Sequence, residues 1–156
     1  PENARWSIPV AAMSIGDCAE FLRDLYPRLT SSNARTSIIS SLAEIGGSEN
    51  ARWLVGIAER EGEPQDIRRR ALAGAQKAGA SIAELVRLYD GTRDARLKES
   101  LIGIYAQSGE RTATDKLISI ARTEEDRALR RKAISRLSKS DDPRVKEALA
   151  QIVERP

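Results

Sequence analysis

Residues 66–79 read DIRRRALAGAQKAG, and three further stretches of the chain follow the same pattern. These stretches are residues 33–46 (NARTSIISSLAEIG), 96–109 (RLKESLIGIYAQSG) and 128–141 (ALRRKAISRLSKSD). The last residues of the four segments, Gly46, Gly79, Gly109 and Asp141, are 33, 30 and 32 residues apart. An interval of this length holds two helices and two turns, so the chain is predicted to consist of stacked helical repeats.

Apolar residues recur at fixed positions of the four segments. The seventh, eighth and fourth residues before the end form three apolar sets: Ile39, Leu72, Ile102 and Ile134; Ile38, Ala71, Leu101 and Ala133; and Leu42, Ala75, Tyr105 and Leu137. Spacings of three and four residues place these side chains on one face of a helix. A basic residue lies eleven residues before the end of each segment, directly after an apolar residue (Ala34, Ile67, Leu97 or Leu129). These four basic residues are called the ladder: Arg35, Arg68, Lys98 and Arg130. Each segment is therefore predicted to be an amphipathic helix.

Partner helices are expected between these segments, near residues 48–61, 81–90, 110–124 and 142–155, with an earlier one near 17–29. Three of them begin with capping signals, namely Ser48, Ser81 with Glu84 three residues later, and Asp142 before Pro143. Gly46, Gly79 and Gly109 suit the left-handed residue that follows a helix end. The repeats then lie near 17–46, 48–79, 81–109 and 110–141, with a final helix at 142–155.

The first sixteen residues fit the pattern less well. ENARW at 2–6 is repeated at 49–53, which indicates a remnant of a preceding repeat. Pro9 interrupts the helical pattern and Gly16 ends it. Residues 1–16 are therefore expected to form an irregular N-terminal cap, and residues 17–156 the repeat domain.

The composition agrees with helical repeats. The chain has 156 residues, within the range of about 100–200 expected for one domain, and 40% of them are apolar. Only 4% are aromatic, and this favours helices packed through aliphatic side chains over sandwiches or barrels. We therefore expect an all-α fold of about four to five helix pairs.

Several classes of function are disfavoured. The chain has no histidine, which removes the usual general base and every histidine-bearing zinc motif, and Cys18 alone forms neither a disulfide framework nor a cysteine metal site. Phosphate-binding glycine loops are absent as well. The two acidic clusters, Asp141 with Asp142 and Glu124 to Asp126, are expected to cap helices. We expect no enzyme, no cofactor and no metal, and a packed Cys18 thiol.

No apolar run approaches the roughly 18 residues of a membrane span, and the start does not resemble a signal peptide. We therefore expect a soluble chain that does not insert into membranes. The sequence begins at Pro1 and not at Met, which suggests a piece of a longer protein. Its compartment, cytoplasmic or exported, and its oligomeric state are left open.

The pattern resembles HEAT repeats, in particular the short subtype of phycobilisome-lyase-like proteins, through DIRRRAL, DARLKESL and EEDRALRRKAI. Lys98 in place of Arg and Asp141 in place of Gly depart from that pattern. The resemblance covers residues 17–155 and implies a right-handed α-α superhelix. It also implies that the ladder holds the turns between helices through Asp66, Asp94 and Asp126. Core or capping positions are expected for Trp6 and Trp53.

In the resembling family, six positions of each repeat line the concave surface, and they lie two, six, nine, ten, thirteen and fourteen residues before the end of the segment. In this chain they hold three acidic residues, Glu44, Asp66 and Glu99, and eight basic ones. These eight residues are called the basic face: Arg69, Arg70, Lys77, Arg96, Arg127, Arg131, Lys132 and Lys139. The balance at these positions is +5, of which the last repeat (residues 110–141) contributes +4, whereas the whole chain carries +3.

Two interpretations of the basic face remain open, a solvated surface or a binding site for an acidic partner. As a site it would serve a non-catalytic protein-binding scaffold that recognises an acidic protein or peptide. The alternative is a nucleic-acid-binding protein related to the HEAT-like alkylpurine DNA glycosylases. That alternative is disfavoured because the concave positions hold no aromatic residue on which a base could stack.

Overall fold

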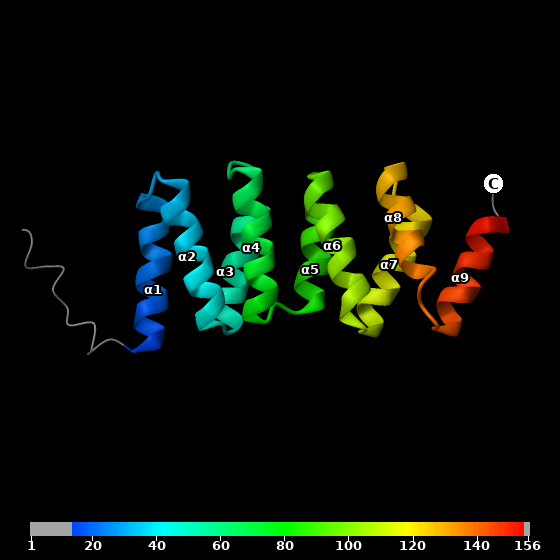
Figure 1. Ribbon diagram of the computed structural model, residues 1–156, viewed down its shortest axis with the longest axis horizontal. Helices are drawn as coiled ribbons and strands as arrows, with labels where there is room; N and C mark the ends of the chain where they lie inside the picture. The colour runs from blue at the N-terminus through cyan, green and yellow to red at the C-terminus, as the bar shows by residue number, and fades with distance from the viewer. Residues whose placement is uncertain (1–13, 155–156) are drawn as a thin grey trace, which may run out of the picture. The chain divides into compact units, whose positions relative to one another are not determined.

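The computed structural model describes residues 14–154, and within this range the chain is all-helical, with nine packed α-helices and no strand. The chain divides into two compact units, Pro1–Ala80 and Ser81–Pro156, called here the N-terminal and C-terminal units. Within each unit the helices pack mainly against their neighbours along the chain (Figure 1). None of the described helices is both long enough and apolar enough to cross a membrane.

The described part of the N-terminal unit, residues 14–80, contains four helices and a short 3-10 turn. They are α1 (Ile15–Leu25), η3 (Tyr26–Arg28), α2 (Ser32–Ile45), α3 (Ser48–Glu59) and α4 (Gln65–Ala78). Helix α4 packs against both α3 and α2. Its contact with α2 is close, because a Cβ atom at Gly74 would lie 3.4 Å from Ala43 Cβ and 3.4 Å from Ile39 Cγ2. Small residues therefore set the separation of these two helices.

The C-terminal unit contains five helices, α5 (Ile82–Gly91), α6 (Ala95–Ser108), α7 (Arg111–Thr123), α8 (Arg127–Leu137) and α9 (Pro143–Glu154). Helix α8 packs against α6 and α7, and α9 packs against α7 and α8. The helices α2, α4, α6 and α8 coincide with the four segments that share the sequence pattern. All three predicted apolar sets lie in the core, with Leu42, Ala75 and Leu101 fully buried, and only Ile134 among them is partly exposed.

The predicted helix ends are confirmed in several places. Ser81 and Glu84 form a capping box at the start of α5. Asp142 Oδ1 accepts a hydrogen bond from the Arg144 amide in the first turn of α9. Gly79 and Gly109 are left-handed, as predicted, whereas Gly46 combines a φ of 72° with an extended ψ.

Three expectations about helix ends were wrong. Helix α1 begins at Ile15, because Ser14 and Asp17 form a capping box that satisfies its first amides, so Gly16 lies inside the helix. Pro27 ends α1 in a 3-10 turn, before the predicted end at 29. Gly47, with a φ of 93°, occupies the N-cap of α3, so that Ser48 is its first helical residue. Residues 1–13, with the repeated ENARW, Trp6 and Pro9, lie outside the described range.

The two units follow one plan. Helices α6 and α7 begin 63 residues after α2 and α3, and α8 begins 62 residues after α4. Tyr26 and Tyr89, near the ends of α1 and α5, are also 63 residues apart, and both are buried. Residues so related can therefore be compared as equivalents, which is useful for both the ladder and the basic face.

Candidate functional site

The ladder residues hold the chain that precedes their own helices. Arg35 Nε donates to the Leu29 carbonyl at 2.9 Å, Arg68 Nε to the Ala58 carbonyl at 2.9 Å, and Arg130 Nη1 to the Glu124 carbonyl at 3.0 Å. Such carbonyl groups at helix ends and turns lack a partner within a helix. Lys98 lies in the equivalent place in α6, with its Nζ 3.6 Å from the Glu124 carboxylate. These contacts connect successive helices inside each unit.

The acidic partners differ in part from those implied by the HEAT resemblance. Arg35 pairs with Glu63 at 3.1 Å, and Lys98 pairs with Glu124. Asp94 and Asp126 serve as N-caps, each accepting hydrogen bonds from the backbone amides of its helix's first turn. The sequence could have indicated these two partners by their position before a segment helix. Glu63 lies two residues before α4, and Glu124 lies three residues before α8.

In each unit, one ladder cation also contacts a tyrosine at or near the end of the first helix, and sequence reasoning did not find this contact. The Arg35 guanidinium lies 5.2 Å from the centre of the Tyr26 ring, and Lys98 Nζ lies 4.9 Å from the centre of the Tyr89 ring. The second neighbour of each tyrosine ring differs between the two units. Trp53 meets Tyr26 edge-on at 5.1 Å, which agrees with its expected packing role, whereas Lys116 lies 5.0 Å from the Tyr89 ring. The shared spacing of nine residues from tyrosine to ladder cation could have revealed this cluster.

The hydrogen bonds of the two tyrosines also differ. Tyr89 Oη donates to Glu124 Oε2 at 2.5 Å, whereas the Tyr26 hydroxyl is buried without a hydrogen-bond partner. Burial, together with the neighbouring glutamate, raises the pKa of Tyr89 well above its usual range. Burial, and after it the negative charge of nearby Glu63, raise the pKa of Tyr26 to about 12. Both side chains are therefore neutral at physiological pH, and neither is poised for acid-base chemistry.

One residue of each acidic cluster caps a helix as predicted, Asp126 at α8 and Asp142 at α9. Burial raises the pKa of Glu124, but the Tyr89 hydrogen bond, the Asp126 amide and Lys98 together hold it below its usual range. Asp142 is paired with Arg144 at 2.9 Å, and that hydrogen bond lowers its pKa. Among residues 14–154, no three metal-ligating side chains come together. Cys18 is a free, partly buried thiol in α1.

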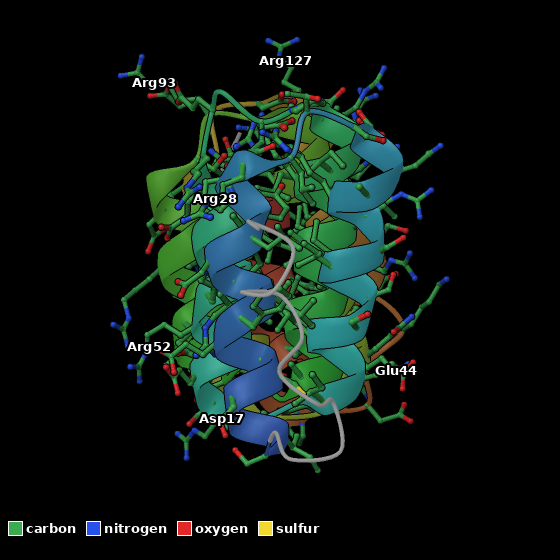
Figure 2. The ribbon with its side chains drawn as sticks, turned by 90° about the vertical axis from the view of Figure 1, so that its left-hand side faces the viewer. Asp17, Arg28, Glu44, Arg52, Arg93 and Arg127 are labelled. Atoms are coloured by element: carbon green, nitrogen blue, oxygen red, sulfur yellow. The ribbon has the colours of Figure 1, made fainter. Side chains whose placement is uncertain are left out.

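In the N-terminal unit, three basic-face residues lie exposed on α4, namely Arg69, Arg70 and Lys77. Lys77 forms an ion pair with Glu44 of α2. Figure 2 shows Glu44 and Arg52 of α3 projecting to opposite sides of this unit, so the α2 and α3 surfaces are separate. A shallow groove of about 260 Å³ between α2 and α4 brings together five of the predicted concave positions: Ser40, Glu44, Arg70, Ala73 and Lys77.

In the C-terminal unit, the remaining basic-face residues come from two helices. Arg96 lies on α6, and Arg127, Arg131, Lys132 and Lys139 lie on α8 or just past its end. Lys139 follows α8 by two residues, and Figure 2 shows Arg127 pointing away from the ribbon. Lys132 forms an ion pair with Glu99 of α6, and its hydrogen bond lowers the pKa of that carboxyl. Lys139 lines a depression of about 340 Å³ at the ends of α6 and α8.

The two units present matching basic triads. Arg69, Arg70 and Lys77 of the first unit correspond, at the offset between α4 and α8, to Arg131, Lys132 and Lys139. One lysine of each triad is paired with a glutamate of the preceding segment helix. Within the described part of the chain, the basic-face residues that make no ion pair are Arg69, Arg70, Arg127, Arg131 and Lys139. Their charges are therefore available to an anionic partner.

No protein-family model matches the chain, and a search of curated proteins finds no match. The structure places the chain in the class of all-helical proteins, and its described residues form nine packed helices. No family is identified by the comparisons, so the resemblance to HEAT repeats depends on the residue pattern alone.

Proposed function

We propose that this chain is a HEAT-type repeat protein with a right-handed superhelix, and that it is a non-catalytic scaffold whose basic face binds an acidic protein or peptide. The observation that carries the proposal is the concentration of charge in the C-terminal unit. There, five basic residues at the predicted concave positions stand against one acidic residue, Glu99, although the whole chain carries only +3. Arginine side chains suit such a partner because their planar forks bind carboxylates with two hydrogen bonds.

The placement of the aromatic residues supports a protein partner over a nucleic acid. Helices α2, α4, α6 and α8 carry one aromatic residue, Tyr105, which is 1% exposed and donates its hydroxyl hydrogen to the Leu85 carbonyl at 2.8 Å. Binding of single-stranded nucleic acid relies on exposed rings that stack on bases. The same helices offer cations for phosphates but no stacking platform, so any nucleic-acid binding would be weak and sensitive to salt.

The test replaces Arg131, Lys132 and Lys139 together with Ser and measures binding of a fluorescent poly-glutamate peptide by anisotropy. We expect the triple variant to retain its helicity, since exposed charges contribute at most about 1 kcal/mol each to stability. We expect it to bind the peptide more weakly, mainly through slower association, with a difference that shrinks as salt rises.

The matched control removes the same charge elsewhere in the C-terminal unit. Arg87, Arg93 and Lys146 are exposed and lie outside the basic face, so replacing them with Ser should weaken binding far less. Equal losses in the two triple variants would mean that net charge, and not the basic face, attracts the peptide. Duplex DNA is measured alongside. Tight DNA binding that persists from about 50 to 200 mM salt would favour the nucleic-acid alternative.

A further inference from the structure

The depression at the ends of α6 and α8 lies beside the basic face, with apolar side chains at its base and polar groups around them. Its lining includes Tyr105, Leu117 and Leu137, which are at most 4% exposed, together with the exposed Ala106. Its volume of about 340 Å³ is near the lower end of the range found for ligand pockets. It is open at the surface, so it suits a side chain of a bound segment better than an enclosed cofactor.

The polar groups around this depression are mostly satisfied within the protein. Thr114 Oγ1 donates to the Glu110 carbonyl at 3.3 Å, and Ser140 Oγ accepts from the Asp142 amide at 3.2 Å. The one carboxylate in the lining, Asp142, is neutralised by Arg144. Two cations, Arg136 and Lys139, make no ion pair with the described residues. The net charge that a ligand meets there is therefore positive.

Lys139 belongs to both the depression and the basic face, which makes the two surfaces continuous. Lys132 lies in α8, and Lys139 lies two residues past the end of that helix. Arg131, adjacent to Lys132, is exposed without an ion pair among the described residues. A chain lying along α8 with its carboxylates on these cations would thus reach the apolar side chains at the base of the depression at its far end.

We infer that the acidic partner is an amphipathic peptide segment, whose carboxylates bind Arg131 and Lys139 while one apolar side chain occupies the depression between the ends of α6 and α8. This inference depends on the proposed function and adds the character of the partner. Burial of an apolar side chain supplies affinity that persists at high salt, whereas the exposed charges supply mainly attraction and orientation. A purely acidic segment would bind the cations and leave the depression empty.

The experiment compares two labelled peptides of Glu and Gly that differ at one central residue, Leu in one and Ala in the other. Wild-type protein should bind the Leu peptide about tenfold more tightly, because a buried Leu side chain contributes roughly 1.4 kcal/mol more than Ala. Ala106→Phe fills the depression and should remove this preference while leaving the Ala peptide unaffected. Ala150→Phe, at an exposed position of α9 outside the depression, is the matched control and should retain it.

The outcomes separate the two proposals. If wild-type protein binds neither peptide, the proposed function and this inference both fail. If it binds both peptides equally, the proposed function stands and the inference is overturned. A preference for Leu that survives Ala106→Phe would also overturn the inference, since the apolar contact would then lie elsewhere. Retained binding of the Ala peptide shows that Ala106→Phe is folded.

Discussion

Removing the hydroxyl group should destabilise the protein at Tyr89 but not at Tyr26. The two residues are equivalent in the two units, and each ring lies beneath the ladder cation of the next helix. Tyr89 Oη donates to the Glu124 carboxylate, whereas the Tyr26 hydroxyl is buried without a hydrogen bond. The Tyr→Phe change keeps the ring in both places, so the pair of variants isolates the contribution of one hydrogen bond.

The expected magnitudes follow from these contacts. A hydrogen bond to a charged group contributes about 1.5–3 kcal/mol, so Tyr89→Phe should lower the free energy of unfolding by about 2 kcal/mol. Lys98 stays 3.6 Å from Glu124 and continues to compensate that carboxylate. Tyr26→Phe removes an unsatisfied buried hydroxyl, and the free energy of unfolding should stay constant or rise by up to about 1 kcal/mol. Because burial raises the pKa of Tyr26 to about 12, this change removes no charge at neutral pH.

The measurement is urea denaturation followed by circular dichroism, with hydrogen exchange read separately in α1 and α5. Hydrogen exchange is needed because the two compact units can unfold in separate transitions, which a single denaturation curve would not assign to one unit or the other. If the whole chain unfolds in one transition, a loss of about 2 kcal/mol corresponds to a fall in Tm of about 4–8 °C. If Tyr26→Phe destabilised its unit as much as Tyr89→Phe destabilises the other, the assignment of the hydrogen bond to Tyr89 alone would be refuted.

Three further predictions address the fold and its pH dependence. Leu72 is 2% exposed, so Leu72→Asp buries an unpaired charge and should cost about 4 kcal/mol or more, enough to unfold the N-terminal unit; a variant as stable as wild type would show that the helical phase is wrong. The pKa of Glu124 is lower in the folded protein than in the unfolded chain, so its contribution is present at neutral pH and is lost as the pH falls below about 4. Glu124→Gln should therefore flatten the acid side of the stability profile measured by urea denaturation, and an unchanged acid slope would contradict this assignment. Far-ultraviolet circular dichroism should show a predominantly helical protein, and a sheet content comparable with the helix content would contradict the fold.

The sequence by itself determined the helices and the residues that they bury. Leu72 and Ala75 are in the core because their spacing places them on the apolar side of α4, and Ser81 caps α5 because Glu84 follows at the required interval. These features depend on groups within a few residues of each other, so their geometry is implied by helix periodicity. Arg70 and Arg131 are exposed, in agreement with the positions that the resemblance to HEAT repeats implies for them.

Only the tertiary structure decided which groups meet across helices. The ion pairs of Lys77 with Glu44 and of Lys132 with Glu99 each connect residues 33 positions apart, and Tyr89 meets Glu124 across 35. The depression beside Lys139 likewise combines residues from α6, α7 and α8. Helix periodicity specifies the side of a helix on which a residue lies, but the partner it meets depends on the rotation and separation of packed helices. Those quantities are set by the fit of many side chains at once, such as the close contact at Gly74, and no local sequence rule contains them.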